Sequence, residues 1–158
     1  MPKISTGPVG TSIPLIEPGQ YVAVATEEVF QEMNFLTYDD NGNAGEREPH
    51  DGLLYKFSLL DDENVLHEVR SKPMKFYANC HPRSAMYKFF EDWLGEVPED
   101  TADGVGEGAL IQIGHDPTGQ YNRVESITSV PKKLSKEIPL IKKAVKSADT
   151  VEDEKEPF

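Results

Sequence analysis

The chain has 158 residues, a hydrophobic share of 37% and a net charge of −12. No stretch approaches 18 consecutive apolar residues and no basic-then-apolar leader opens the sequence, so we expect a soluble, cytoplasmic protein without membrane contact. Cys80 is the single cysteine, which excludes an internal disulfide and a cysteine-based zinc cluster, and we interpret it as structural.

Charge is distributed unevenly along the chain. Residues 132–146 carry six lysines and one acid, a net charge of +5, whereas residues 149–158 carry five acids and one lysine, a net charge of −4. Residues 1–131 therefore hold the remaining −13. Because proteins contact phosphates mainly through Lys and Arg, this acidic body argues against nucleic-acid binding unless its few bases gather locally.

Composition divides the chain into four parts. Residues 1–18 contain four prolines and two glycines with no helical or strand period, which predicts an extended N-terminal arm. We expect a folded domain over 19–131, a lysine-rich segment over 132–148, either a short basic helix or a flexible arm, and an acidic tail over 149–158. The tail has too little apolar surface to offset its ordering entropy, so we expect it to be disordered.

The first half of the domain predicts three strands. β-favouring residues over 20–30 form the first strand, and 53–60 form the second, with Tyr55, Phe57 and Leu59 alternating against Leu54, Lys56 and Ser58. The third covers 65–72 after a turn at 61–64. Between the first two, residues 31–52 predict a long connection, in which Phe35, Leu36 and Tyr38 can form a short continuation of the first strand. A calcium loop counted from Asp39 fails, because Ala44 and His50 stand where Gly and Glu are needed.

The second half predicts one helix and two more strands. Ser84 can cap a helix whose apolar face runs to Leu94, and Gly95 ends it. A strand over 109–115 leads through the turn 116–119 to a strand over 120–129. In that last strand Val124 and Ile127 have different phases, which a β-bulge would reconcile.

The order of elements, β-β-β-α-β-β, is that of an OB-fold. We therefore predict a mainly β protein, a five-stranded OB-fold barrel with one helix between strands three and four and disordered termini. The usual ligand face of this barrel is built from strands two and three and two connections, which here are 31–52, 53–72 and 116–119.

Basic residues gather on that predicted face. Lys56, Arg70, Lys72 and Lys75 are four of the nine bases in residues 1–131, and we expect them, with Arg123, to contact phosphates. Candidates for stacking on nucleobases are Tyr38, Tyr77 and Tyr121. The alternative is a charged, solvated hairpin face.

The last residues suggest a partner site. Acids precede a terminal Pro-Phe, so an apolar pocket rimmed by Arg or Lys could take the last ring and the α-carboxylate together. The residues of this expected partner site are Glu152, Asp153, Glu154, Glu156, Pro157 and Phe158.

This terminus resembles that of bacterial single-stranded DNA-binding proteins and of several phage counterparts. The body, about residues 18–131, also resembles phage replication-module proteins through Pro18-Gly-Gln-Tyr-Val-Ala-Val, Leu54-Tyr-Lys-Phe-Ser-Leu-Leu, the helix from Ser84, Ala109-Leu-Ile-Gln-Ile and Asn122-Arg-Val. The resemblance implies a protein of DNA replication, recombination and repair whose tail recruits partner proteins and competes with DNA for a basic groove.

These observations favour a non-catalytic single-stranded DNA-binding protein that needs no cofactor, and they leave a homo-oligomer open. The acidic body supports an alternative, an interaction module that mimics DNA or serves as a replisome adaptor. A metal-dependent nuclease is disfavoured, because the four histidines are scattered and no carboxylate cluster, nucleophile–base pair or phosphate loop is recognisable.

Overall fold

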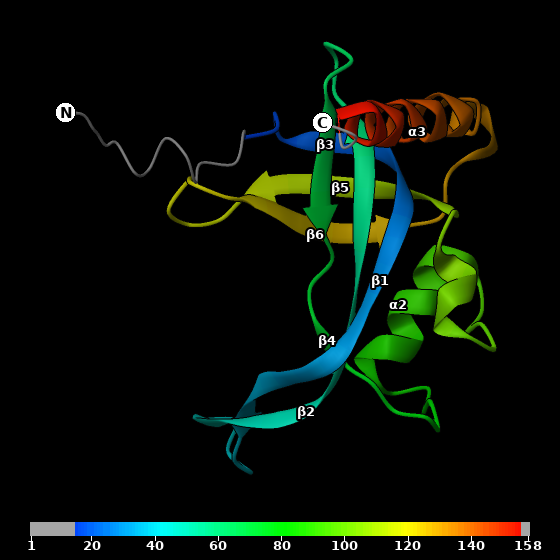
Figure 1. Cartoon of the computed structure of the whole chain (residues 1–158). Coiled ribbons are helices and arrows are strands. Elements are labelled where there is room, and N and C mark those ends of the chain that lie inside the picture. Colours follow the sequence, from blue (N-terminus) through cyan, green and yellow to red (C-terminus); the bar gives the residue numbers. More distant parts are fainter. Residues whose placement is uncertain (1–14, 156–158) are drawn as a thin grey trace.

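A computed structural model describes residues 15–155 of the chain, with side chains as far as Ser147. The protein is mainly β, with a six-stranded antiparallel sheet and two α-helices among these residues (Figure 1). The strands are β1 (Gly19–Tyr38), β2 (Ala44–Leu60), β3 (Leu66–Arg70), β4 (Met74–Lys75), β5 (Gly108–His115) and β6 (Asn122–Thr128). The helices are α2 (Ala85–Leu94) and α3 (Glu137–Lys155), and two short 3₁₀ turns are η2 (Thr101–Gly104) and η3 (Lys132–Leu134).

The sheet is not closed. Its strand order is β3-β2-β1-β5-β6, with the short β4 paired to β2 outside this path. Strands β3 and β6 are thus the two edges, and they lie near each other without forming a ladder. The five predicted strands are present, but β4 was not predicted, because two residues after Pro73 show no alternation that could reveal a strand.

Residues 31–52 form a hairpin rather than the predicted long connection, and the expected strand continuation at Phe35, Leu36 and Tyr38 lies within β1. β1 and β2 pair from Ala23 and Leu59 out to Tyr38 and Ala44, so both strands continue beyond the rest of the sheet (Figure 1). We call residues 27–38 and 44–52 the arm. Only the turn between Tyr38 and Ala44 is a loop. The prediction failed because both faces of the arm are largely solvated, so few of its positions require an apolar residue.

The core lies on one face of the sheet, under α2. The predicted alternation of β2 is confirmed, since Tyr55, Phe57 and Leu59 are fully buried. Trp93 of α2 packs on Tyr55 and Phe57, with ring centroids 5.1 and 5.4 Å apart, and its Nε1–H donates to the Gly108 carbonyl at 2.8 Å. This hydrogen bond ties the helix to β5 in the middle of the core.

The predicted helix boundaries and bulge are confirmed. The Ser84 side chain accepts the Tyr87 amide at the start of α2, and Gly95 ends the helix at φ 84°. On β6, Ser126 pairs with Gln112 while Val124 pairs with Ile113, so Glu125 is the extra residue that brings the strand back into phase.

Helix α3 covers the opposite face of the sheet. Ile141, Ile138 and Val145 pack on Val22 and Val24 of β1 and form a second, smaller core. The lysine-rich segment is therefore mostly an amphipathic helix. Among the described residues no helix is long and apolar enough to cross a membrane.

The helix also continues further than expected. It includes Glu152, Asp153 and Glu154 and ends at Lys155, so this part of the tail is helical rather than disordered. Residues 140–155 contain neither Gly nor Pro, and helix formers such as Lys, Glu and Ala let the helix continue from its packed first half. Glu156, Pro157 and Phe158 lie outside the described residues, as does most of the N-terminal arm.

The described end of the N-terminal segment predicted over 1–18, which is distinct from the β1–β2 arm, is fixed to the sheet. Ile16 is buried in the main core. Its amide donates to Asn122 Oδ1, and its carbonyl accepts a hydrogen bond from His115 Nε2, each at 2.8 Å. The chain therefore enters the domain at the β5–β6 end, beside the edge strand β6.

Candidate nucleic-acid interface

Three hollows follow one another along the segment from β3 to Tyr77, and we call them together the track. The first, of about 500 Å³, lies between β3 and β6; the second, of about 420 Å³, lies beside residues 71–74 and α2; the third, of about 300 Å³, lies beside β4 and the arm. Val124 lines both the first and second hollows, and Pro73, Met74 and Ala85 line both the second and third. The shared residues make the track continuous.

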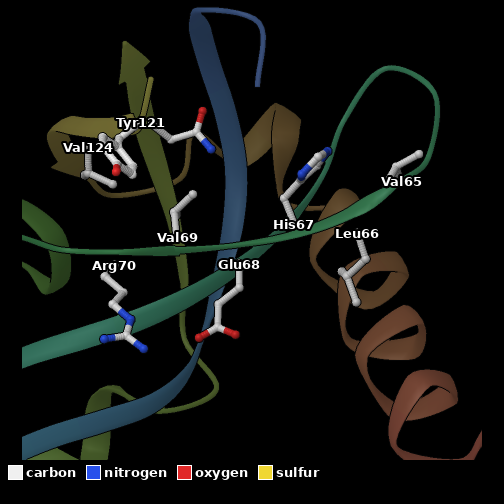
Figure 2. A pocket seen from close by; sticks show the side chains of 9 residues that line it. Val65, Leu66, His67, Glu68, Val69, Arg70, Tyr121 and Val124 are labelled. Carbon is white, nitrogen blue, oxygen red and sulfur yellow. The ribbon is translucent and has the colours of Figure 1, made fainter. Parts of the chain in front are cut away.

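The first hollow occupies the gap between the two sheet edges. Figure 2 shows His67 and Val69 on the side of β3 that faces β6, with Tyr121 and Val124 across the gap. Tyr121 is 54% exposed and offers a ring at the mouth of this hollow. Arg70 also belongs to the lining, but its side chain points away from β6, on the same side as Glu68.

Two lysines from different elements line the second hollow. Lys72 follows β3 and Lys88 comes from α2, and the apolar lining includes Phe89 of the same helix and Ile127 of β6. Both lysines are exposed. Asp92 and Glu125 also line this hollow, so its charge is mixed.

The third hollow is aromatic and basic. Phe35 of the arm, Lys75 of β4 and Tyr77 line it. His50 lies between the two rings, with centroids 6.3 Å from Phe35 and 5.0 Å from Tyr77. Lys75 Nζ stands 6.0 Å from the Phe35 centroid, a cation–π distance, and Tyr77 is 42% exposed. Residues far apart in the chain thus build one partly exposed surface, in which aromatic rings lie beside a cation as in sites that take stacked nucleobases next to a phosphate.

Two of the predicted phosphate contacts lie side by side, away from the gap between β3 and β6. Lys56 and Arg70 are direct partners across β2 and β3. Lys56 Nζ lies 2.9 Å from Glu27 and 3.9 Å from Glu68, so its charge is already matched by two carboxylates. The expected four-base cluster therefore separates: Lys72 and Lys75 line the second and third hollows, Arg70 lines the first with its side chain pointing away from β6, and Lys56 of β2 lines none of the three.

The remaining predicted residues do not join the track. Tyr38 is 66% exposed at the tip of the arm, and Arg123 is exposed on β6 opposite Gly114. Neither lines any of the three hollows. In the tail, the described residues Glu152, Asp153 and Glu154 belong to α3.

Sequence reasoning did not find Phe35, His50 or Lys88 as site residues. The signal was present for Phe35: Val29, Met33 and Phe35 recur at even spacing, which is a strand pattern on one face. His50 is placed by register, since it pairs with Met33 in the arm. That pairing depends on the five-residue turn after Tyr38 and cannot be read from composition.

The turn that leads into β3 is held by an acid. Asp61 Oδ1 accepts the amides of Glu63 and Val65, while Oδ2 lies 2.7 Å from Nε2 of His67. The hydrogen bond from His67, followed by that from the Val65 amide, lowers the pKa of the Asp61 carboxyl below its usual value. His67 is thereby fixed at the end of the first hollow.

Comparison with protein-family models, with curated proteins and with solved structures finds no match to this chain.

Proposed function

We propose that this chain binds single-stranded DNA without catalysis, in the cytoplasm, as a protein of DNA replication, recombination and repair. One observation carries the proposal: the exposed rings of Tyr77 and Tyr121, the half-buried ring of Phe35 and three lysines line the three neighbouring hollows of the track. Bases would stack on Tyr121, Phe35 and Tyr77, while Lys72, Lys75 and Lys88 meet the phosphates. Phage origin is part of the same proposal and rests on the resemblance of the sequence.

We also propose that the sheet is an OB-fold left open at one seam. Without the two-residue β4, the strands in chain order pair as third-second-first-fourth-fifth, and α2 lies between the third and fourth. An OB barrel has this order, with the third and fifth strands closing it partly. Here those strands are β3 and β6, and the first hollow occupies the seam between them.

The tail has a proposed role as well. Glu152, Asp153, Glu154, Glu156, Pro157 and Phe158 would bind replication or repair proteins, by the resemblance stated above. The helical course of α3 through Glu154 would present the first three of these acids on a helix rather than on an extended chain.

The test is a titration of the full-length protein with fluorescent oligo-dT at several salt concentrations. Binding should weaken with salt, with a log–log slope of about 0.7 for each phosphate neutralised on a single strand. The double variant Lys72→Ala/Lys75→Ala should bind more weakly and with a shallower slope. The matched control Lys142→Ala/Lys143→Ala removes two exposed lysines of α3 and should bind like the unaltered protein. No binding at low salt would end the proposal.

A second candidate is an acidic interaction module that does not bind DNA. The neutralisation of Lys56 by Glu27 and Glu68 favours it, because the predicted basic face is partly cancelled. In that case oligo-dT would not bind at any salt concentration, and the Lys72→Ala/Lys75→Ala variant would still capture a basic partner protein from solution.

A further inference from the structure

Helix α3 has one packed face and one open face. Ile138, Ile141 and Val145 lie against the sheet. Lys142, Lys143 and Lys146 are all exposed on the same helix. With 3.6 residues per turn, Lys143 lies opposite the packed face and Lys142 and Lys146 lie on its flank, while Leu140 is 60% exposed. Lys132, Lys133 and Lys136 precede the helix and are exposed too. We call these six lysines the lysine face.

The charge on the lysine face is largely unmatched within the chain. Lys132, Lys133, Lys136, Lys142 and Lys143 form no ion pair with any residue of the described part. The segment 132–146 nevertheless carries a net +5 in a protein of net charge −12. A basic surface of this kind needs an anionic occupant from outside the chain.

The same molecule has a surface of opposite charge. Residues 91–107, covering the end of α2 and the turn η2, hold seven acids and no base: Glu91, Asp92, Glu96, Glu99, Asp100, Asp103 and Glu107. All seven are exposed, and none forms an ion pair among the described residues. Val105, 39% exposed, lies among them as Leu140 lies among the lysines. We call this stretch the acidic segment.

We propose that the lysine face of one copy docks on the acidic segment of a second copy of this chain. The two surfaces match in charge, and each contains one exposed aliphatic side chain. They are different surfaces, because α3 and α2 cover opposite faces of the sheet and lie apart from each other (Figure 1). The contact is therefore heterologous, and copies add head to tail.

DNA fits the lysine face less well than a second copy does. Single strands bind where aromatic rings accompany the bases, and residues 132–147 contain no Phe, Tyr or Trp. In addition, no residue of 132–146 lines any of the three hollows of the track. A second copy explains in addition why the body is so acidic, since the acidic segment holds more than half of its net charge of −13.

Salt affects this contact in a defined way. Two copies of net charge −12 repel each other, but the Debye length of about 8 Å at physiological ionic strength screens that repulsion while ion pairs in contact persist. Higher salt, near 1 M, where the Debye length is about 3 Å, weakens the contacts themselves. Association should therefore be seen at moderate salt and be lost at high salt.

The experiment is sedimentation velocity of the full-length protein, without DNA, over a range of concentrations at moderate and at high salt. The unaltered protein should associate at moderate salt only. Lys142→Glu/Lys143→Glu and Glu96→Lys/Glu99→Lys should each weaken association by about tenfold or more, because each replaces attraction with like-charge repulsion. An equimolar mixture of the two variants should associate again, since each supplies the surface that the other lacks. Circular dichroism checks that both variants fold.

Three outcomes would overturn the proposal: an unaltered protein that stays monomeric at moderate salt, a mixture of variants that fails to associate, or equal association at both salt concentrations. A loss of oligo-dT binding in Lys142→Glu/Lys143→Glu, measured with an oligonucleotide that holds one copy, would assign the lysine face to DNA instead. Because the sedimentation experiment contains no DNA, it can fail while the proposed DNA binding stands, and the reverse.

Discussion

The β1–β2 hairpin has two halves that contrast sharply. In the sheet half, Ala23 and Ala25 of β1 and Phe57 and Leu59 of β2 are almost completely buried. In the arm, the same two strands continue with every residue except Gly52 exposed or half-buried, and Phe30 is 52% exposed. The backbone pairing is continuous apart from irregularities between Ala25 and Glu27 and between Leu36 and Tyr38. One ladder of hydrogen bonds thus serves two purposes, a core wall and a projecting surface.

The difference shows what each half depends on. The burial of apolar side chains under α2 stabilises the sheet half. The arm is stabilised by a few contacts at its edge, such as that between the rings of Phe30 and Phe76, whose centroids are 4.8 Å apart. Isolated two-stranded hairpins are marginal in water, so these contacts with β4 and the residues after it are what fix the arm. The following substitutions test that division, from the largest expected effect to the smallest.

Phe57→Ala should lower the free energy of unfolding by about 3–5 kcal/mol, because it empties a fully buried ring position against Trp93. Urea unfolding followed by circular dichroism measures the loss. Phe30→Ala is the matched change in the arm, where about half of the ring is already in water, and it should cost far less. Equal losses would mean that the arm folds as part of the core.

Tyr77→Ala should weaken oligo-dT binding by about 1–3 kcal/mol, the usual contribution of one stacked base, while stability changes little because the ring is 42% exposed. Fluorescence anisotropy gives the affinity. Tyr38→Ala removes an equally large but more exposed ring from the tip of the arm, off the track, and should have the smaller effect. The opposite ranking would place the DNA along the arm.

Gly52→Ala, at the junction between the two halves, should lower the free energy of unfolding by about 1 kcal/mol. A Cβ there would stand 2.6 Å from Met33 Sδ and 3.0 Å from Phe35 Cζ, so both side chains must move. Because Phe35 lines the third hollow, oligo-dT affinity should fall as well. Adding Met33→Ala removes the closer contact and should recover part of the stability in urea unfolding.

The two turns that flank β2 allow a comparison by pH. Asp39 accepts the amides of Asn41 and Asn43, and Asp61 accepts those of Glu63 and Val65 and also holds His67. The pKa of each carboxyl is lowered, for Asp39 mainly by the Asn43 amide and for Asp61 mainly by His67. Their stabilisation is complete above the ordinary Asp pKa of about 3.9 and is lost as pH falls through the lowered values.

Asp61→Asn should therefore flatten the fall in unfolding midpoint between neutral and acid pH. Asp39→Asn should do so less, because its turn lies at the tip of the arm, where unfolding is local. Urea midpoints collected from pH 7 downward measure both. A steeper acid dependence in Asp61→Asn would contradict the sign of the lowered pKa.

Much of the sheet could be predicted from the sequence, because a strand with one buried face has apolar residues at every second position. The alternation of Tyr55, Phe57 and Leu59, the cap at Ser84, the stop at Gly95 and the phase change before Ile127 each have a local physical cause. The arm has a weaker signal, the even spacing of Val29, Met33 and Phe35, because most of its positions face water and need no apolar residue. The helix over the tail as far as Lys155 was not predicted, because the acidic composition of that segment is typical of disordered chains.

The candidate site was predicted only in part. Lys72, Lys75, Tyr77 and Tyr121 line the track, whereas Lys56 does not and forms an ion pair with Glu27, which the bulge in β1 places opposite it. Pairings such as that of His50 with Met33 depend on register across a hairpin. A one-residue change in the turn would have placed different side chains on the same face.

Trp93 is the single tryptophan of the chain, and it is enclosed by the rings of Tyr55, Phe57, Phe89 and Phe90. Its intrinsic fluorescence therefore reports on the integrity of the core. The exposed rings of the track are tyrosines and a phenylalanine, whose emission lies at shorter wavelength. Unfolding and ligand binding are thus spectrally separated in the native chain, and neither measurement requires an added label.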